Sequence, residues 1–101
     1  MNKLKDVEYQ INNDGIAEVY VHALSTWDGF DEIIDYLLKN YNVEIISNEK
    51  KYYNRDAVLN INGYQLLFSN DDLFGNVFTG VDASSGPFLK KLSKDIAAKL
   101  R

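Results

Sequence analysis

The residues whose type and spacing most clearly suggest a chemical role are four carboxylates, Asp28, Asp31, Glu32 and Asp35. The last three follow Asp28 by three, four and seven residues, a spacing that places all four on one side of an α-helix. A surface of this kind attracts a cationic partner. It is not a catalytic signature, because no nucleophile motif or metal-binding pattern accompanies it.

The segment that carries these carboxylates has the pattern of an amphipathic helix. Its apolar residues recur with the helical period on the opposite side, at Phe30, Ile33, Ile34, Leu37, Leu38 and Tyr41. Ser25, Thr26 or Asp28 can cap the start of the helix, which is expected to end near Asn40. Since the apolar side must face a core, the carboxylates face water or a partner.

Two explanations of this acidic side stay open. Carboxylates near a helix N-terminus stabilise its dipole by roughly 0.3–1 kcal/mol each, and a solvated face needs no other purpose. However, aspartate is a poor helix former, and Asp31, Glu32 and Asp35 repel one another at helical spacing. Only Lys39 is placed to relieve Asp35. The pattern therefore predicts either a solvated face or a partner-binding surface.

Two further features could extend such a surface. Asp71 and Asp72 follow a predicted strand, in a segment expected to be a turn. Paired carboxylates in a loop can hold Mg²⁺ or Ca²⁺, but the ligand alternation of a calcium loop is missing. Trp27 starts the helix and is expected to pack over the sheet edge, where a half-exposed tryptophan could also anchor a partner.

Catalysis is not predicted. His22 is the only histidine, and strand alternation places it outward with Glu18 and Tyr20. The sequence contains no cysteine, no phosphate-binding loop and no dinucleotide fingerprint. We therefore expect no enzymatic activity, no cofactor and no resident metal ion.

The basic residues form two groups. Lysine, tyrosine and arginine mix in residues 50–55, a pattern found in single-strand binders and in protein interfaces, but also expected of an exposed turn. Residues 84–101 carry a net charge of +4, whereas the rest of the chain carries −8. An acidic body repels phosphate, so nucleic-acid binding by the whole chain is disfavoured.

Alternating apolar residues predict a mainly antiparallel sheet of about five to six strands with two helices on one face, an α+β fold with the order ββαβββ(β)α. The expected strands are 7–11, 17–22, 43–46, 57–61, 64–68 and, as the sixth, 73–79. Residues 48–55 are expected to be a strand end and a turn, and residues 69–72 a polar break. The last helix is expected to start near Pro87.

Asn62-Gly63 is the strongest turn signal, because both positions of a type I′ turn need positive φ. A two-residue loop there pairs Ile61 with Tyr64 and puts the alternate apolar residues of both strands on one face.

Length and composition fit one domain, residues 1–101. No segment has the apolar length of a membrane helix, and the N-terminus lacks the apolar run of a signal peptide. The absence of cysteine fits a reducing compartment, so a cytoplasmic location is expected.

The chain resembles the small bacterial immunity proteins that neutralise polymorphic or contact-dependent toxins. The resemblance lies in the size, the acidic body, the α+β plan and two segments, Trp27-Asp28-Gly29-Phe30 and Ile61-Asn62-Gly63-Tyr64. It implies a cytoplasmic protein that binds one toxin domain and blocks its active site. Many such toxins are cationic nucleases, to which an acidic inhibitor is the electrostatic complement.

Two other classes of function stay open. One is a general protein-interaction or adaptor domain. The other is a nucleic-acid or small-ligand binder that uses the basic C-terminal helix. A stoichiometric complex with a basic protein favours inhibition, whereas strongly salt-dependent binding to RNA or DNA favours the last class.

Overall fold

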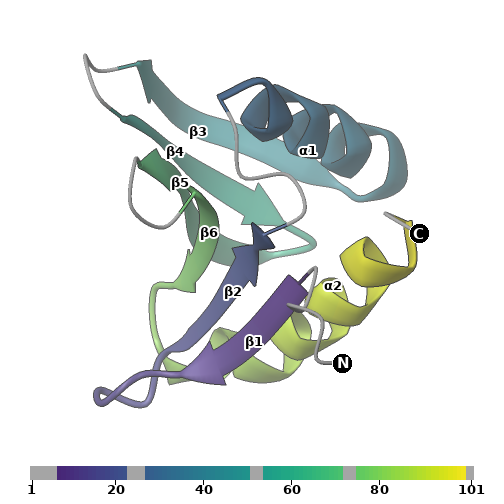
Figure 1. Cartoon of the computed structure of the whole chain (residues 1–101). Coiled ribbons are helices and arrows are strands. Elements are labelled where there is room, and N and C mark those ends of the chain that lie inside the picture. The colour runs from purple at the N-terminus through teal and green to yellow at the C-terminus, as the bar shows by residue number, and fades with distance from the viewer. Residues whose placement is uncertain (1–6, 23–26, 51–53, 72–74, 100–101) are drawn as a thin grey trace, which may run out of the picture.

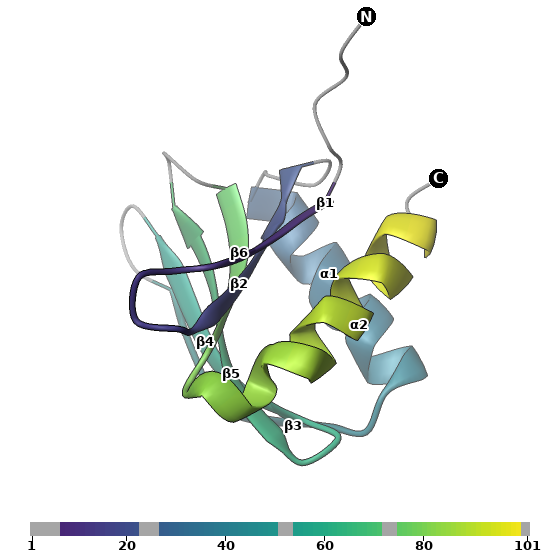
Figure 2. The ribbon, with the colours of Figure 1, turned by 90° about the horizontal axis from the view of Figure 1, so that it is seen from below.

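The computed structural model of the chain is a six-stranded antiparallel sheet with two α-helices on one face (Figures 1 and 2). It describes residues 7–22, 27–50, 54–71 and 75–99, with only the backbone described at Trp27 and Asp71. The order of elements, ββαββββα, confirms the predicted α+β fold.

The strands are β1 (Val7–Ile11), β2 (Ala17–Val21), β3 (Val43–Lys50), β4 (Arg55–Ile61), β5 (Tyr64–Asp71) and β6 (Gly75–Gly80). The helices are α1 (Trp27–Asn40) and α2 (Gly86–Lys99), and a 3₁₀ turn, η2 (Ala83–Ser85), precedes α2. Across the sheet the strands lie in the order β1-β2-β6-β5-β4-β3. Strand β6 therefore joins the N-terminal hairpin to the β3-β4-β5 meander.

The core lies between the sheet and the helices. On β4 every second residue is buried, from Arg55 through Ala57 and Leu59 to Ile61. Phe30 and Leu37 of α1 are fully buried, as the helical period predicts. Because the other face of the sheet has no helix among the described residues, the strands show the alternation of a sheet covered on one side.

Two strands end in polar residues. The end of β3 within residues 48–55 was expected, whereas the length of β5 was not. Strand β3 continues to Lys50, past a register shift between Ile45 and Ser47 that has the character of a β-bulge. Strand β5 continues to Asp71, so the polar break expected at residues 69–72 is wrong for 69–71. In both cases polar residues continue the ladder because a neighbouring strand supplies the hydrogen bonds.

The hairpin between β4 and β5 has the predicted register. Ile61 is opposite Tyr64, and Leu59 is opposite Leu66. Asn62 and Gly63 have φ values of 53° and 92°, and the Gly63 N–H donates to Asn60 Oδ1 at 3.0 Å. The turn therefore depends on positive φ at both positions.

We expect Gly63→Val to lower the free energy of unfolding by more than ~1 kcal/mol. An added Cβ at Gly63 meets no atom within 4 Å, so the cost comes from the backbone conformation alone. Chemical denaturation measures it, with Gln65→Val on the adjoining exposed strand position as the control. An unchanged denaturation midpoint would contradict this account of the turn.

A carboxylate links the two helices. Asp95 of α2 accepts hydrogen bonds from the hydroxyls of Tyr36, at 3.0 Å, and of Tyr41. Burial, followed by the hydrogen bond to Asp95, raises the pKa of Tyr41 well above its ordinary value. The same two causes raise the pKa of Tyr36.

This link predicts a loss of stability in alkali. Because the folded protein holds the Tyr41 proton more tightly than the unfolded chain, the stabilisation is complete below pH ~10 and decreases as the pH rises further. Tyr41→Phe should cost about 1–2 kcal/mol at neutral pH and make the alkaline decline shallower. Denaturation curves at several pH values test this, with Tyr64→Phe as the control. A decline as steep in Tyr41→Phe as in the wild type would contradict it.

Candidate partner-binding surfaces

The carboxylates of α1 lie on its solvent side, as predicted. Asp28, Asp31, Glu32 and Asp35 are all exposed. Three of them, Asp28, Glu32 and Asp35, form no ion pair with any residue that the structure describes. Among the α1 side chains that the structure describes, the large apolar one exposed to solvent is Leu38, at 47%.

Asp31 differs from the other three because it has a structural contact. Its Oδ1 lies 2.8 Å from Nη1 of Arg55, whose side chain is only 9% exposed, against 60% for Asp31. The Arg55 guanidinium also lies over the Phe30 ring, 4.4 Å from its centroid. Removing Asp31 would take a carboxylate partner from the buried Arg55 guanidinium, a charge that stays desolvated. Asp31 therefore helps to fasten α1 to β4, whatever else it binds.

The exposed turn expected within residues 50–55 is wrong at Arg55. The arginine is the first residue of β4 and points into the core side of the sheet. Lys50 is exposed at the end of β3. Residues 51–53 lie outside the described residues, so an interface role for this mixture of basic and aromatic residues stays a prediction.

The acidic extension predicted at Asp71-Asp72 begins inside a strand rather than in a turn. Asp71 is the last residue of β5, and Asp72 lies outside the described residues. The preceding Asn70 is buried, and its Nδ2 donates to Oδ1 of buried Asn76 at 2.8 Å. For Trp27 the structure places the backbone at the start of α1, and its predicted role as an anchor stays a prediction.

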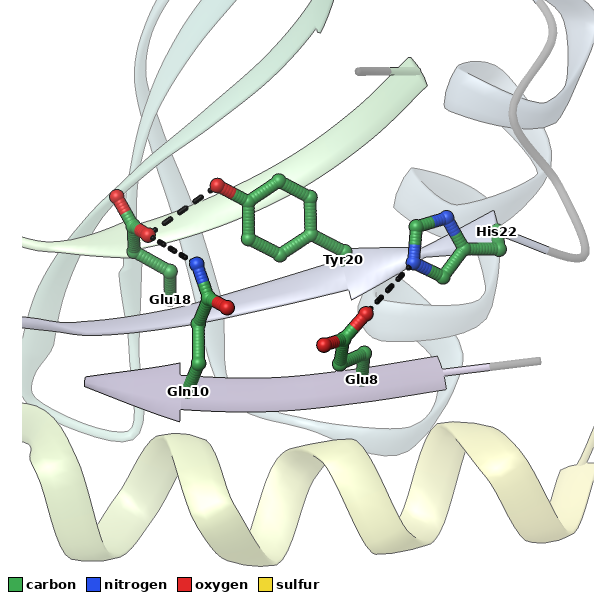
Figure 3. Close-up of polar contacts among 5 residues, drawn as sticks. All are labelled: Glu8, Gln10, Glu18, Tyr20 and His22. Carbon is green, nitrogen blue, oxygen red and sulfur yellow. Dashed lines mark hydrogen bonds and ion pairs between the residues drawn. The ribbon is translucent and has the colours of Figure 1, made fainter. Parts of the chain in front are cut away.

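The uncovered face of the sheet carries a second acidic surface, which sequence alternation only partly indicated. It presents Glu8 and Gln10 of β1, Glu18 and Tyr20 of β2, and His22 just after β2, on the side of the strands away from α2 (Figure 3). Glu18 accepts hydrogen bonds from Gln10 at 3.0 Å and from the Tyr20 hydroxyl at 3.2 Å.

His22 lies at the end of this network. Its Nε2 is 3.1 Å from Glu8 Oε1, and its ring stacks on Tyr20. Burial and the nearby Glu18 raise the pKa of Tyr20, so this hydroxyl is a hydrogen-bond donor rather than a base. Among the described residues, the side chain hydrogen-bonded to His22 is the Glu8 carboxylate, so no nucleophile–base pair is found there.

Among the described residues, no group of three or more histidine, aspartate or glutamate side chains could hold a metal ion. One open hollow of about 260 Å³ lies between the β4–β5 turn and η2. This is below the ~300–1,000 Å³ of typical ligand pockets. Its lining includes Tyr64, Val81 and Asp82.

The basic C-terminal helix keeps its lysines in solvent. Lys90, Lys91 and Lys94 are exposed on α2, and the Lys99 ammonium lies 5.9 Å from the centroid of the Tyr36 ring. Cations near a helix C-terminus are favourable in themselves. The acidic and basic surfaces are therefore both present, on different elements.

None of the described helices is long and apolar enough to cross a membrane. A comparison with protein-family models finds no match, and neither do comparisons with curated proteins and with solved structures.

Proposed function

We propose that this protein is a non-catalytic binding protein that covers a cationic protein partner, as an immunity protein covers its toxin domain. The observation that carries the proposal is the state of the α1 carboxylates. Asp28, Glu32 and Asp35 are exposed and form no ion pair with the described residues, whereas Asp31 alone serves the fold through Arg55.

Electrostatics supports this choice of partner. Residues 1–83 carry a net charge of −8, which attracts a basic surface over distances of about a Debye length, ~8–10 Å near physiological salt. A toxin nuclease presents lysine and arginine in its phosphate-binding cleft, and carboxylates can occupy that cleft in place of phosphate. Trp27, Asp71 and Asp72 are proposed as neighbouring contacts, and the cytoplasm as the location.

One observation favours a second candidate. The exposed lysines Lys90, Lys91 and Lys94 of α2 would suit a nucleic acid or another anionic ligand. The acidic remainder of the chain disfavours binding of a nucleic acid, because its net negative charge repels phosphate.

The proposal is tested with the protein encoded by the gene next to this one. We expect its purified basic domain to form a one-to-one complex with this chain and to lose its toxicity on co-expression. Stopped-flow mixing should show association slowing as salt rises from low to physiological concentration. Absence of a complex, together with salt-dependent binding of RNA that Lys90→Gln and Lys94→Gln abolish, would favour the second candidate.

A further inference from the structure

The uncovered face of the sheet has an apolar centre. Four adjoining strands, β2, β6, β5 and β4, each contribute one residue to it, namely Tyr20, Val77, Leu67 and Val58. Tyr20 is opposite Val77, and Leu67 is opposite Val58. Leu67 is 37% exposed, and the other three are half-buried. Val77 and Leu67 are diagonal neighbours on β6 and β5, because Val77 is opposite Ser69 and Leu67 is opposite Thr79. The centre thus consists of two apolar pairs in adjoining rows of the sheet.

Carboxylates border this centre on both sides. Glu8 and Glu18 lie on the β1–β2 side. Glu44, Glu49 and Asp56 lie on the β3–β4 side, where Glu49 is opposite Asp56. Among the strand residues that the structure describes on this face, none is lysine or arginine, because Arg55 and its cross-strand neighbour Lys50 belong to the other side.

An apolar centre with a polar border is the usual composition of a protein interface. The fold does not require it here, since the core is built entirely on the opposite side of the sheet. Strand residues in contact only with water could be polar throughout, yet Leu67 and Val58 lie side by side where no described helix or strand covers them.

The geometry points to a second docking surface, on the open face of the sheet, for a protein surface that carries lysine or arginine around exposed apolar side chains. The acidic border selects the charge of the occupant, and the centre selects its apolar part. The same face of a second copy is a poor occupant, because an isologous contact would bring carboxylates against carboxylates. This surface is separate from α1, which lies on the other side of the sheet (Figure 2).

The test uses the full chain and an amphipathic peptide of leucine and lysine, with hexalysine as the purely cationic probe. Backbone amide NMR titrations follow the shifts. We expect the leucine–lysine peptide to shift Val58, Leu67 and Val77 and to bind more tightly than hexalysine. Leu67→Ser should weaken this binding about fivefold or more, whereas Leu38→Ser on α1 is the matched control and should not.

If Leu67→Ser fails to fold, Val58→Thr serves as the second variant, because threonine keeps the shape and the β-branching of valine. Val58→Thr should also lower the affinity for the leucine–lysine peptide. Equal binding of hexalysine and the leucine–lysine peptide, or no effect of either variant, would overturn the inference. So would concentration-dependent self-association that Leu67→Ser abolishes, because a second copy would then be the occupant. None of these outcomes bears on the α1 carboxylates, which separate variants test.

Discussion

A variant with Asp28→Asn, Glu32→Gln and Asp35→Asn should bind the cationic partner at least ~100-fold more weakly than the wild type, about 2.7 kcal/mol, while folding normally. The three side chains are exposed and form no ion pair with the described residues, so their neutralisation removes no contact of the fold. In a complex they would face lysine or arginine, and close charge pairs across interfaces couple by ~1.5–7 kcal/mol.

Asp31 is left unchanged in this variant because of its contact with Arg55. A quadruple variant would mix a loss of binding with a loss of stability, since the desolvated guanidinium would lose a partner. Leaving Asp31 in place keeps the two effects apart.

The matched control changes the net charge by the same amount elsewhere. Asn13→Lys and Asp14→Lys together add three positive units at exposed residues of the β1–β2 turn, outside both proposed surfaces. Titration calorimetry should show a much smaller loss for this control than for the α1 variant. Equal losses of affinity in the two variants would mean that the net charge of the protein, and not the position of the α1 carboxylates, determines binding. An unchanged affinity in the folded α1 variant would mean that these carboxylates form a solvated helix face and do not bind the partner.

Local periodicity was sufficient to predict most elements of the fold. The carboxylates and apolar residues of α1 separate at the helical period, and the structure exposes the carboxylates and buries Phe30, Ile33, Ile34 and Leu37 as expected. Leu38, expected on the buried side, is 47% exposed, because it lies at the edge of the apolar side. The β4–β5 register follows from Asn62-Gly63 and from alternation, because a slip of one residue would turn Leu59 and Leu66 outward.

Contacts between distant residues could not be predicted in this way. Asp31 and Arg55 are 24 residues apart and meet only because the fold brings α1 beside the first residue of β4. Asn70 was expected in a polar break, yet it lies in β5 and donates to Asn76 of β6 inside the sheet. The local sequence around a polar residue does not show whether another strand supplies its hydrogen-bond partner.

The residues that meet on the open face of the sheet could not be predicted from local sequence either. Alternation predicts which residues point outward on each strand but not the order of the strands. Only the position of β6 between β2 and β5 brings the Tyr20–Val77 pair diagonally next to the Leu67–Val58 pair. The second docking surface is therefore a product of topology, whereas the α1 surface follows from one segment of sequence.

The largest loss of stability is expected at Phe68. Its ring stacks on Phe30 of α1, with centroids 4.4 Å apart, and on Phe78 of β6, with centroids 4.2 Å apart. All three side chains are fully buried. Phe68 is therefore the point where α1, β5 and β6 meet, and the ring is surrounded by fixed side chains that cannot easily close a cavity.

Phe68→Ala should lower the free energy of unfolding by about 3–5 kcal/mol, from the lost burial of the ring and the cavity that remains. Since small domains have only ~5–15 kcal/mol in total, the variant should lie close to the limit of folding. Urea denaturation measures the change, and Phe68→Leu should recover much of it if the variant with alanine is too unstable. Phe88→Ala is the control, because the Phe88 ring is only half-buried between Tyr41 and Tyr64 and should cost clearly less. A cost at Phe68 no greater than at Phe88 would contradict the central place of the stacked rings, and the stability of the fold would then have to lie in the aliphatic side chains of β4 and α2.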